Sequence, residues 1–361
     1  MEMGSHGNRR FEGDEGFGMT HVERKRFWAG RPVLVTGASG LMGGWTTKAL
    51  LDLGAEVIIL LRDQVPGSML VREGVLEQCI VVHGQLEDYS LLRRACSDYS
   101  IDTIFHLAAQ PLVGVAKLDP VSTLETNVKG TWNILEAARV TQVKQVVVAS
   151  SDKAYGSSNN LPYLETHPLN GEYPYDVSKS CADLISSMYA KTYGMRVGIA
   201  RCANLFGGGD LNFSRTIPGV IKATLEGERF QIRSDGKFVR DFLYVKDAAQ
   251  AYLTLAEGLA SGAAAPGDGF NFSLEVRLTV IELAEMVLKL MRSSLEPEIL
   301  NRASAEIREQ YLSCEKAKQQ LGWRPEYPME RALAETIDWY RNHFAAIAAR
   351  VEMPVAAGRA Q

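Results

Sequence analysis

The stretch PVLVTGASGLMGG, residues 32–44, decides the fold of this chain. A β-branched run ends in three glycines with the spacing GxxGxxG, and a helical pattern follows over residues 46–53. Gly37 permits a tight turn, Gly40 lets the backbone approach a phosphate, and Gly43 lets the helix pack close to the strand. Because the N–H groups at a helix N-terminus attract anions, the stretch predicts a turn that binds the pyrophosphate of a dinucleotide.

Short apolar runs alternate with helical patterns downstream of this turn, which is typical of an α/β fold with a doubly wound, Rossmann-like parallel sheet. Further strands are expected at residues 57–61, 79–82, 103–107, 145–150 and 196–200. The pattern becomes irregular after Asn204, and this indicates a smaller C-terminal substrate-binding domain beside the carboxyl edge of the sheet.

Four parts of the chain are expected. Residues 1–28 lack periodicity and are interpreted as a flexible leader, and residues 346–361 as a tail. The dinucleotide-binding domain is assigned to residues 29–203 and 236–260, and the smaller domain to residues 204–235 and 261–345.

Composition excludes several classes of protein. The 361 residues are 46% hydrophobic, enough for one large α/β unit, and the net charge of -4 offers no basic stripe for nucleic acid. The 5 cysteines show no CxxC or Cys/His ligand spacing, so neither a disulfide framework nor a metal site is expected. No apolar run reaches the roughly 18–20 residues that span a bilayer and no signal peptide is evident, so we expect a cytoplasmic protein without a membrane partner.

Two adjacent charged residues bear on the choice of dinucleotide. Asp63 follows Gly43 by the interval of the acidic residue that accepts a hydrogen bond from the adenosine ribose, which favours NAD. Arg62 could instead hold the 2′-phosphate of NADP, so that alternative stays open. The expected cofactor contacts are Gly37, Ser39, Gly40, Leu41, Met42, Gly43, Arg62, Asp63, Gln85, Leu86, Leu107, Ala108, Ala109, Asn127, Tyr175 and Lys179.

Tyr175 and Lys179 stand at positions i and i+4, so on a helix their side chains share one face. A phenol with a reference pKa near 10 is a poor base at neutral pH. A neighbouring ammonium and the positive charge of a nicotinamide both favour the phenolate, which can then remove a hydroxyl proton. The pair therefore predicts oxidation of an alcohol.

Taken in order, the motifs are similar to those of the extended short-chain dehydrogenases, the NAD-dependent epimerase/dehydratase family, and most of all the CDP-glucose 4,6-dehydratase-like group. The resemblance spans residues 33–340. It is carried by GGW (43–45), HLAAQPLV (106–113), NVKGT (127–131), SDKAY (151–155), PYDVSK (174–179), RCAN (201–204), RDFLYV (240–245), QYL (310–312) and LGWRP (321–325). It implies NAD as the cofactor and a nucleotide sugar as the substrate.

The triplet Ser151-Asp152-Lys153 favours a 4,6-dehydratase, because elimination of water needs an acid and a base beside the tyrosine. The implied reaction begins with removal of the C4 hydroxyl proton by Tyr175. Asp152 protonates the departing C6 hydroxyl, and Lys153, or a group that it orients, removes the C5 proton. Many relatives have Asp-Glu where this chain has Asp-Lys. A nucleotide-sugar epimerase and a non-catalytic dinucleotide-binding regulator are the alternatives.

For the substrate, the resemblance implies that the Asn204 amide and the Arg240 guanidinium contact the phosphates, as a planar fork of donors can. Gln110, Arg302 and Gln310 are expected to contact the substrate as well. Helices around residues 121–138 and 182–193 correspond to those through which such enzymes form homodimers by a four-helix bundle. The base of the nucleotide and the identity of the hexose stay open.

Overall fold

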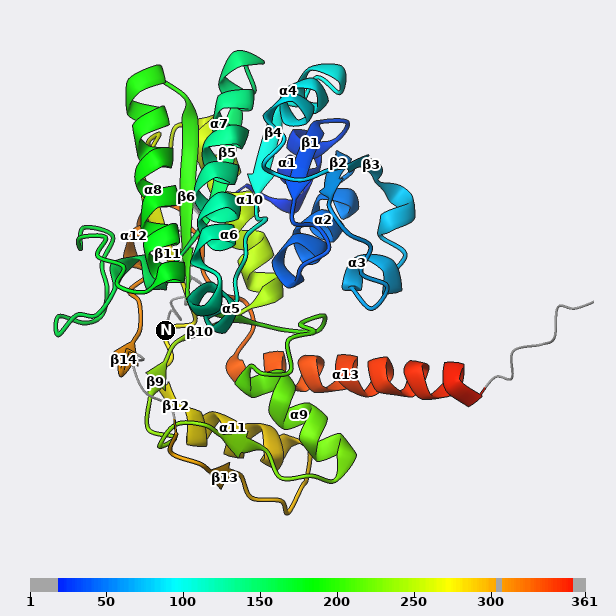
Figure 1. Ribbon diagram of the computed structural model, residues 1–361. Helices are drawn as coiled ribbons and strands as arrows, with labels where there is room; N and C mark the ends of the chain where they lie inside the picture. The colour runs from blue at the N-terminus through cyan, green and yellow to red at the C-terminus, as the bar shows by residue number, and fades with distance from the viewer. Residues whose placement is uncertain (1–18, 303–306, 353–361) are drawn as a thin grey trace, which may run out of the picture.

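A computed structural model describes residues 19–302 and 307–352, and a parallel sheet of seven strands lies at its centre (Figure 1). The strand order is β11-β6-β5-β4-β1-β2-β3. The strands are β1 (Pro32–Thr36), β2 (Glu56–Leu61), β3 (Ile80–His83), β4 (Thr103–His106), β5 (Gln145–Ser151), β6 (Arg196–Cys202) and β11 (Gly269–Phe272). The predicted Rossmann-like fold is confirmed, because the chain passes from β1 outward through β2 and β3 and then returns to β4 on the other side of β1.

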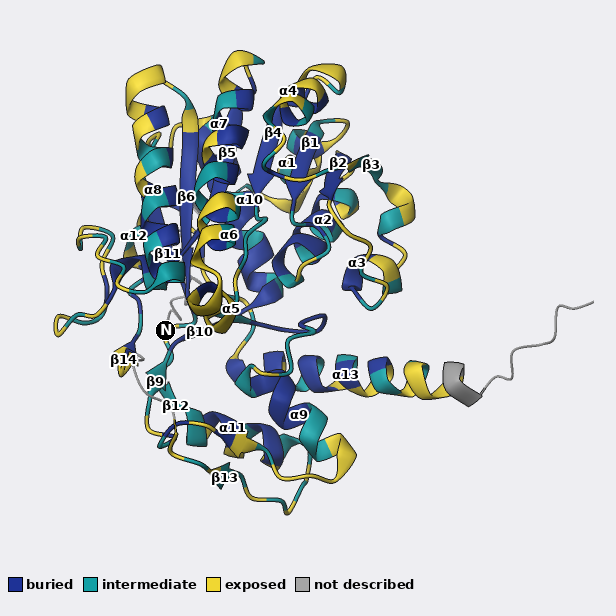
Figure 2. Ribbon diagram, in the orientation of Figure 1, coloured by how far each residue is buried: buried dark blue, intermediate teal, exposed yellow. Residues whose placement is uncertain are grey.

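Helices cover both faces of the sheet, so its strands are buried on both sides (Figure 2). Val33 and Val35 of β1 enter one core, whereas Leu34 between them enters the other, as the period of two requires. One face is covered by α1 (His21–Trp28), α2 (Leu41–Asp52) and α10 (Val245–Ser261), and the other by α4 (Tyr89–Asp98), α7 (Gly130–Val140) and α8 (Pro174–Tyr193).

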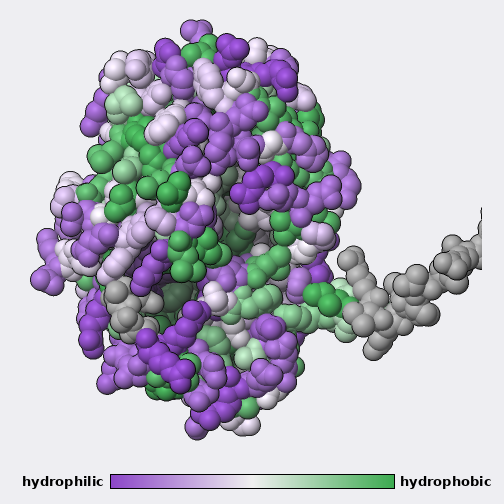
Figure 3. Space-filling model, in the orientation of Figure 1, coloured by the Kyte–Doolittle hydropathy of each residue, from purple (hydrophilic) through white to green (hydrophobic). Residues whose placement is uncertain are grey.

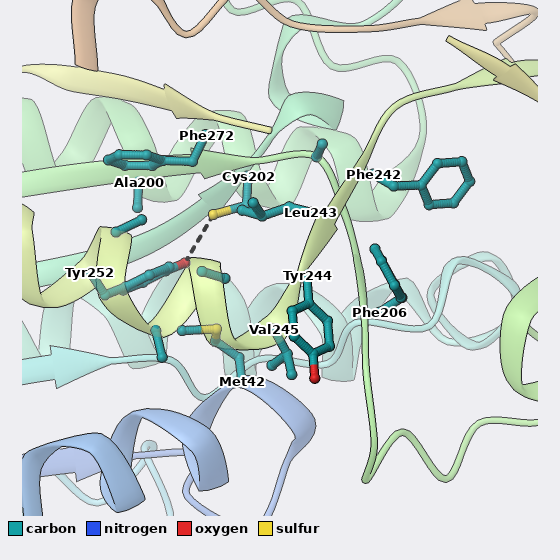
Figure 4. Packing of buried hydrophobic residues seen from close by; sticks show 14 of the residues in the cluster. Met42, Ala200, Cys202, Phe206, Phe242, Leu243, Tyr244, Val245, Tyr252 and Phe272 are labelled. Carbon is teal, nitrogen blue, oxygen red and sulfur yellow. Dashed lines mark hydrogen bonds between the residues drawn. The ribbon is translucent and has the colours of Figure 1, made fainter. Parts of the chain in front are cut away.

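The first core reaches the carboxyl ends of the strands beneath the region where a ligand would lie. Met42 of α2, Cys202 of β6 and Tyr252 of α10 gather there, and the Cys202 thiol lies 3.8 Å from the Tyr252 hydroxyl (Figure 4). Short segments connect the main elements of the sheet domain. These are α3 (Met69–Arg72), η1 (Leu76–Gln78), α5 (Val113–Leu118), α6 (Pro120–Leu124), the π-helical η2 (Glu125–Lys129) and η3 (Asp152–Tyr155).

The smaller lobe lies below the sheet in Figure 1 and is built on α9 and α11, which pack together. Its elements are β7 (Asn204–Phe206), α9 (Thr216–Glu226), β8 (Gln231–Ile232), β9 (Val239–Arg240), β10 (Phe242–Tyr244), β12 (Leu278–Thr279), α11 (Val280–Leu290), β13 (Glu298–Ile299), β14 (Glu309–Gln310) and α13 (Met329–Glu352). The helix α12 (Glu315–Leu321) instead packs against β11 and α10 of the sheet domain. Within the described residues, no helix is long and apolar enough to cross a membrane.

The expected boundaries differ from the structure at both ends of the chain. Residues 21–28, expected in the leader, form α1, whose Trp28 is fully buried and donates a 2.7 Å hydrogen bond to Glu257 of α10. Residues 346–352, expected in the tail, continue α13. The rest of the predicted leader and tail, residues 1–18 and 353–361, lie outside the described residues.

Two strands also depart from the expected division into domains. Residues 269–272 were assigned to the smaller domain, but β11 pairs with β6 as the edge of the central sheet. Residues 239–240 were assigned to the dinucleotide-binding domain, but β9 pairs with β12 and β14 in the lower lobe. Both strands take their place by pairing with residues that are distant in sequence, which a local pattern does not reveal.

Candidate active site

A cavity of about 1600 Å³ lies between the carboxyl ends of the strands and the smaller lobe. Figure 3 shows it as a hollow between the upper and lower parts of the molecule. Sites for one small ligand usually enclose roughly 300–1,000 Å³, so this cavity has room for a dinucleotide and a second ligand. It lies at the switch point of the strand order, where open α/β sheets bind their ligands.

The glycine loop between β1 and α2 forms one wall of the cavity. Gly37 has a positive φ of 76°, and a Cβ there would lie 2.7 Å from the Cα of Ala108. A Cβ at Gly43 would lie 2.0 Å from the carbonyl oxygen of Gly37. Within the described residues no side chain caps the N-terminus of α2 at Gly40, so its N–H groups can bind a pyrophosphate. The loop fits the dinucleotide that the sequence predicts.

Arg62 and Asp63 follow β2 at the rim of the same cavity. The Arg62 Nε donates to an Asp63 carboxylate oxygen at 2.6 Å, and both side chains are largely exposed. The carboxylate thus balances the guanidinium charge that would attract the 2′-phosphate of NADP. Gln85 and Leu86, after β3, line the cavity beside them.

Leu107, Ala108 and Ala109 follow β4 and line the cavity, as expected, but their two neighbours in the predicted site do not. The Asn127 side chain is buried, accepts from the backbone N–H of Gln110 at 2.7 Å and donates to Ser178 at 2.9 Å. The Gln110 amide bonds Leu112 and Thr123. Among the described residues both side chains therefore brace the loop after β4, and their expected contacts with the cofactor and the substrate stay predictions.

The carboxyl end of β5 and the first turns of α8 bring the five expected catalytic side chains to one part of the cavity wall. They are Ser151, Asp152, Lys153, Tyr175 and Lys179. The Lys179 Nζ donates to the carbonyl oxygen of Ala149 at 2.8 Å, and burial lowers its pKa to about 8. Burial and the Asp152 charge raise the pKa of Tyr175 to about 12. The protein alone therefore keeps this phenol protonated at neutral pH.

Asp152 is only 2% exposed, although it lines the cavity. Burial raises the pKa of its carboxyl, against the opposing charges of Lys153 and Arg240. Ser151 donates its hydroxyl proton to one carboxylate oxygen at 2.9 Å, and the other oxygen has no hydrogen-bond partner among the described residues. A buried carboxyl with a free oxygen is suited to hold a proton and to donate it.

Asp176 is a further cavity residue that the sequence analysis did not single out. It is 2% exposed, and burial raises its pKa to about 6, although the charge of Lys153 opposes this. The residue is the third of α8, and its carboxylate accepts from the backbone of Tyr173, which caps the helix. A carboxylate at the third position of a helix is a usual capping signal, so only the tertiary fold reveals that Asp176 faces the cavity.

Three of the five expected substrate residues line the lower part of the cavity. Asn204 and Arg240 line it, and the Asn204 amide donates to the carbonyl oxygen of Asp241 at 3.0 Å. The exposed Arg302 also lines it. Gln310 is fully buried, and among the described residues it is not part of the lining. Its amide oxygen instead accepts from the Lys153 Nζ at 2.6 Å.

Comparison with known proteins agrees with this geometry. The model of the NAD dependent epimerase/dehydratase family matches residues 33–270. The chain belongs to this family. It is therefore an enzyme of the nucleotide-sugar dehydratase/epimerase type, and its cofactor is NAD.

Individual relatives include both reaction types. The chain is 29% identical to the CDP-glucose 4,6-dehydratase of Salmonella typhimurium, covering 88% of this chain and 92% of that one. It is 30% identical to the UDP-glucose 4-epimerase of Halalkalibacterium halodurans, covering 86% and 96%. The structure of DesIV, the dTDP-glucose 4,6-dehydratase of Streptomyces venezuelae with NAD bound, superimposes with a TM-score of 0.79 at 28% identity, covering 87% and 98%.

Proposed function

We propose that this protein is an NAD-dependent 4,6-dehydratase that converts a nucleotide-linked hexose to the 4-keto-6-deoxy sugar. The observation that carries this proposal is Asp152. A buried carboxyl whose pKa burial raises lies on the same cavity wall as Tyr175 and Lys179. Elimination of water needs such an acid, whereas the exchange of configuration at C4 does not.

The tyrosine performs the first proton transfer. NAD, when bound, supplies the electron acceptor for oxidation at C4. The buried ammonium of Lys179 stabilises the phenolate form of Tyr175, which takes the C4 hydroxyl proton and becomes the neutral phenol. Ser151 lies beside Tyr175 on the cavity wall, so its hydroxyl can turn to donate to the oxygen that becomes the ketone.

Elimination then uses the end of β5. The 4-ketone acidifies the C5 proton, and Asp152 gives its proton to the C6 oxygen as the carbon–oxygen bond breaks, which releases water and leaves a C5–C6 double bond. The hydride removed from C4 then returns to C6 and a proton returns to C5, which gives the 4-keto-6-deoxy sugar and restores the oxidised cofactor. Two side chains of the cavity wall are candidates to accept the C5 proton, Lys153 and Asp176. Lys153 donates to Gln310 and faces the charges of Asp152 and Asp176, which favours its ammonium form and supports Asp176 as the acceptor.

The epimerase alternative rests on relatives such as the Halalkalibacterium halodurans enzyme. An epimerase would need Tyr175 and Ser151 but would leave the Asp152 carboxyl idle. A buried, incompletely hydrogen-bonded carboxyl costs free energy, and a fold that gained no activity from it would be more stable with an apolar residue.

We also propose that the protein is a homodimer through α7 and α8. Large apolar side chains are exposed on the helices of this side, among them Val121 of α6, Trp132 of α7, and Leu184 and Met188 of α8. Hydrophobic surface is visible on the same side in Figure 3. A contiguous apolar surface of this kind marks an interface.

The cytoplasmic location stays a prediction from the sequence.

The test is product analysis with purified, NAD-loaded protein. CDP-, GDP-, UDP- and dTDP-glucose are each incubated with the protein, and the products are examined by mass spectrometry and by absorbance in alkali. We expect one of them to lose water and to give an alkali-absorbing 4-ketone. A product of unchanged mass but altered configuration would show an epimerase, and binding of NAD without any turnover would favour a regulator.

A further inference from the structure

Gln310 contacts Lys153 from the other lobe. It lies in β14, 157 residues from Lys153 in sequence, yet its Oε1 accepts from the Lys153 Nζ at 2.6 Å. The glutamine is fully buried, whereas Lys153 lines the cavity from the end of β5. The amide therefore touches the lysine from behind the cavity wall.

The strand that holds Gln310 also lies against the predicted phosphate contact. β14 pairs in parallel with β9, and Gln310 is the register partner of Arg240, which lines the cavity. A single pair of short strands thus joins the residue expected at the substrate phosphates to the residue that holds Lys153. A shift of β9 on phosphate binding would move the Lys153 ammonium with it.

The chemistry of the side chain indicates why a glutamine stands here. Its Nε2 is buried and has no hydrogen-bond partner among the described residues. A buried donor without a partner destabilises the folded state, and a leucine of similar size would avoid this cost. Unlike a leucine, the glutamine amide supplies an oxygen that accepts the hydrogen bond from the Lys153 ammonium.

We propose that Gln310 is a positioning residue that holds the Lys153 ammonium at the reacting sugar and couples its position to the phosphate-binding strand β9. The proposal rests on the proposed function, because it concerns the lysine of that site. Gln310 acts through Lys153 and does not touch the substrate. This differs from the direct substrate contact that the sequence predicts.

Four proteins in a double-mutant cycle test the proposal: wild type, Gln310→Leu, Lys153→Met and the double variant. Gln310→Leu should lower kcat about 10- to 100-fold, the scale of loss from a misplaced catalytic group, with little change in KM. In the Lys153→Met background the same substitution should have no further effect, because the two residues act as one unit. Gln310→Glu keeps an acceptor at the same reach and should recover most of the turnover.

The control is Gln319→Leu, which removes an exposed glutamine of α12 that bonds Glu315. It should leave kcat unchanged. A higher KM with normal kcat in Gln310→Leu would make Gln310 a substrate contact, and losses that multiply in the double variant would show independent action. A lower melting temperature with unchanged kcat would leave it a structural residue. Each of these three results overturns the proposal.

Failure of this proposal is distinct from failure of the proposed function. The identity of the wild-type product, 4-ketone or epimer, tests the function, and the cycle is measured on whichever product forms. A readout without turnover is the rate at which acetic anhydride acylates Lys153 in NAD-loaded protein, followed by peptide mass spectrometry. Gln310→Leu should change this rate and Gln319→Leu should not. An unchanged rate in Gln310→Leu would refute the contact.

Discussion

Asp152 is ionisable but only 2% exposed to solvent, and burial disfavours the charged form of its carboxyl. We expect Asp152→Asn to slow elimination by about 10²- to 10⁴-fold, the usual contribution of a general acid, while oxidation at C4 continues. The asparagine keeps the shape and the bond to Ser151 but cannot release a proton to the C6 oxygen. Rapid-quench analysis should show accumulation of oxidised sugar. Full turnover by this variant would contradict the assignment of Asp152 as the acid.

Tyr175 belongs to the preceding step. Tyr175→Phe should abolish the absorbance change that reports NADH formation in a single turnover. Binding of the nucleotide sugar should stay nearly intact, because the phenol oxygen acts in the transition state more than in the ground state. Stopped-flow absorbance measures the first quantity and calorimetry the second. Near-normal oxidation together with unchanged affinity would exclude Tyr175 as the base.

Asp176 gives a prediction about pH and stability. Its pKa is raised from 3.8 to about 6 in the folded protein, so the unfolded chain loses this proton at lower pH than the folded one. The unfolded state therefore binds fewer protons between pH 4 and 6, and the contribution of this group to stability falls as the pH rises through that window. Asp176→Asn should remove a penalty of up to about 3 kcal/mol above pH 6, at about 1.4 kcal/mol for each unit.

The measurement is urea unfolding of wild type and Asp176→Asn at pH 4 and pH 8. The variant should gain most at pH 8, and an equal difference at both pH values would refute the raised pKa. If the carboxylate accepts the C5 proton, the more stable variant should also be slower and should lose exchange of C5 deuterium with solvent. Lys153→Met should then retain that exchange.

At the residue scale, the sequence predicts groups that form a local pattern and misses groups that the fold brings together. Tyr175 and Lys179 are recognisable because they stand at positions i and i+4 of one helix. Asp176 resembles an ordinary helix cap, and only β5 packing against the start of α8 turns it toward Lys153. Gln310 is separated by 157 residues from the lysine that it holds, so its role has no local signal.

At the scale of the element, the turn between β1 and α2 depends on glycine for space. Gly43→Ala should prevent NAD binding or destabilise the fold, because its Cβ would lie 2.0 Å from the Gly37 carbonyl oxygen. Relief of this clash would require the backbone of the turn to shift, which costs free energy. The measurements are NAD titration and thermal unfolding. The matched control is Gly67→Ala, whose Cβ would meet only the Leu211 side chain at 3.4 Å. Normal NAD affinity and stability in Gly43→Ala would contradict the tight packing.

The helix α1 was missed by the sequence analysis although its start carries a recognisable signal. Thr20 and Glu23 form a reciprocal capping box, in which each side chain accepts from the backbone of the other. The segment has little amphipathic pattern because it buries mainly Trp28 and attaches through an ion pair between Arg24 and Glu257. Charged contacts with a distant helix leave no periodicity in the sequence, so composition alone indicated a leader.

At the scale of the whole molecule, periodicity predicts the central sheet well because each strand is an apolar run that two helix layers bury. The strands β1 to β6 lie within two residues of their expected ends. The edge strand β11 was missed because the chain returns to the sheet only after residues 203–268, which form α10 and part of the smaller lobe. The cavity arises from this return, since its two walls come from segments that only the complete fold places together.

The exposed apolar side chains of α6, α7 and α8 form the surface through which two copies should associate. In a twofold dimer the residues close to the symmetry axis lie near their own copies, so charges introduced at the centre of the interface meet like charges. Leu184→Glu combined with Met188→Glu should therefore convert a dimer to a monomer in analytical ultracentrifugation, whereas Val22→Glu on the exposed side of α1 should leave the dimer intact. The cavity itself is built within one chain, and the monomeric variant should still bind NAD. A wild-type protein that sediments as a monomer at micromolar concentration, or a double variant that remains dimeric, would show that this surface has another purpose.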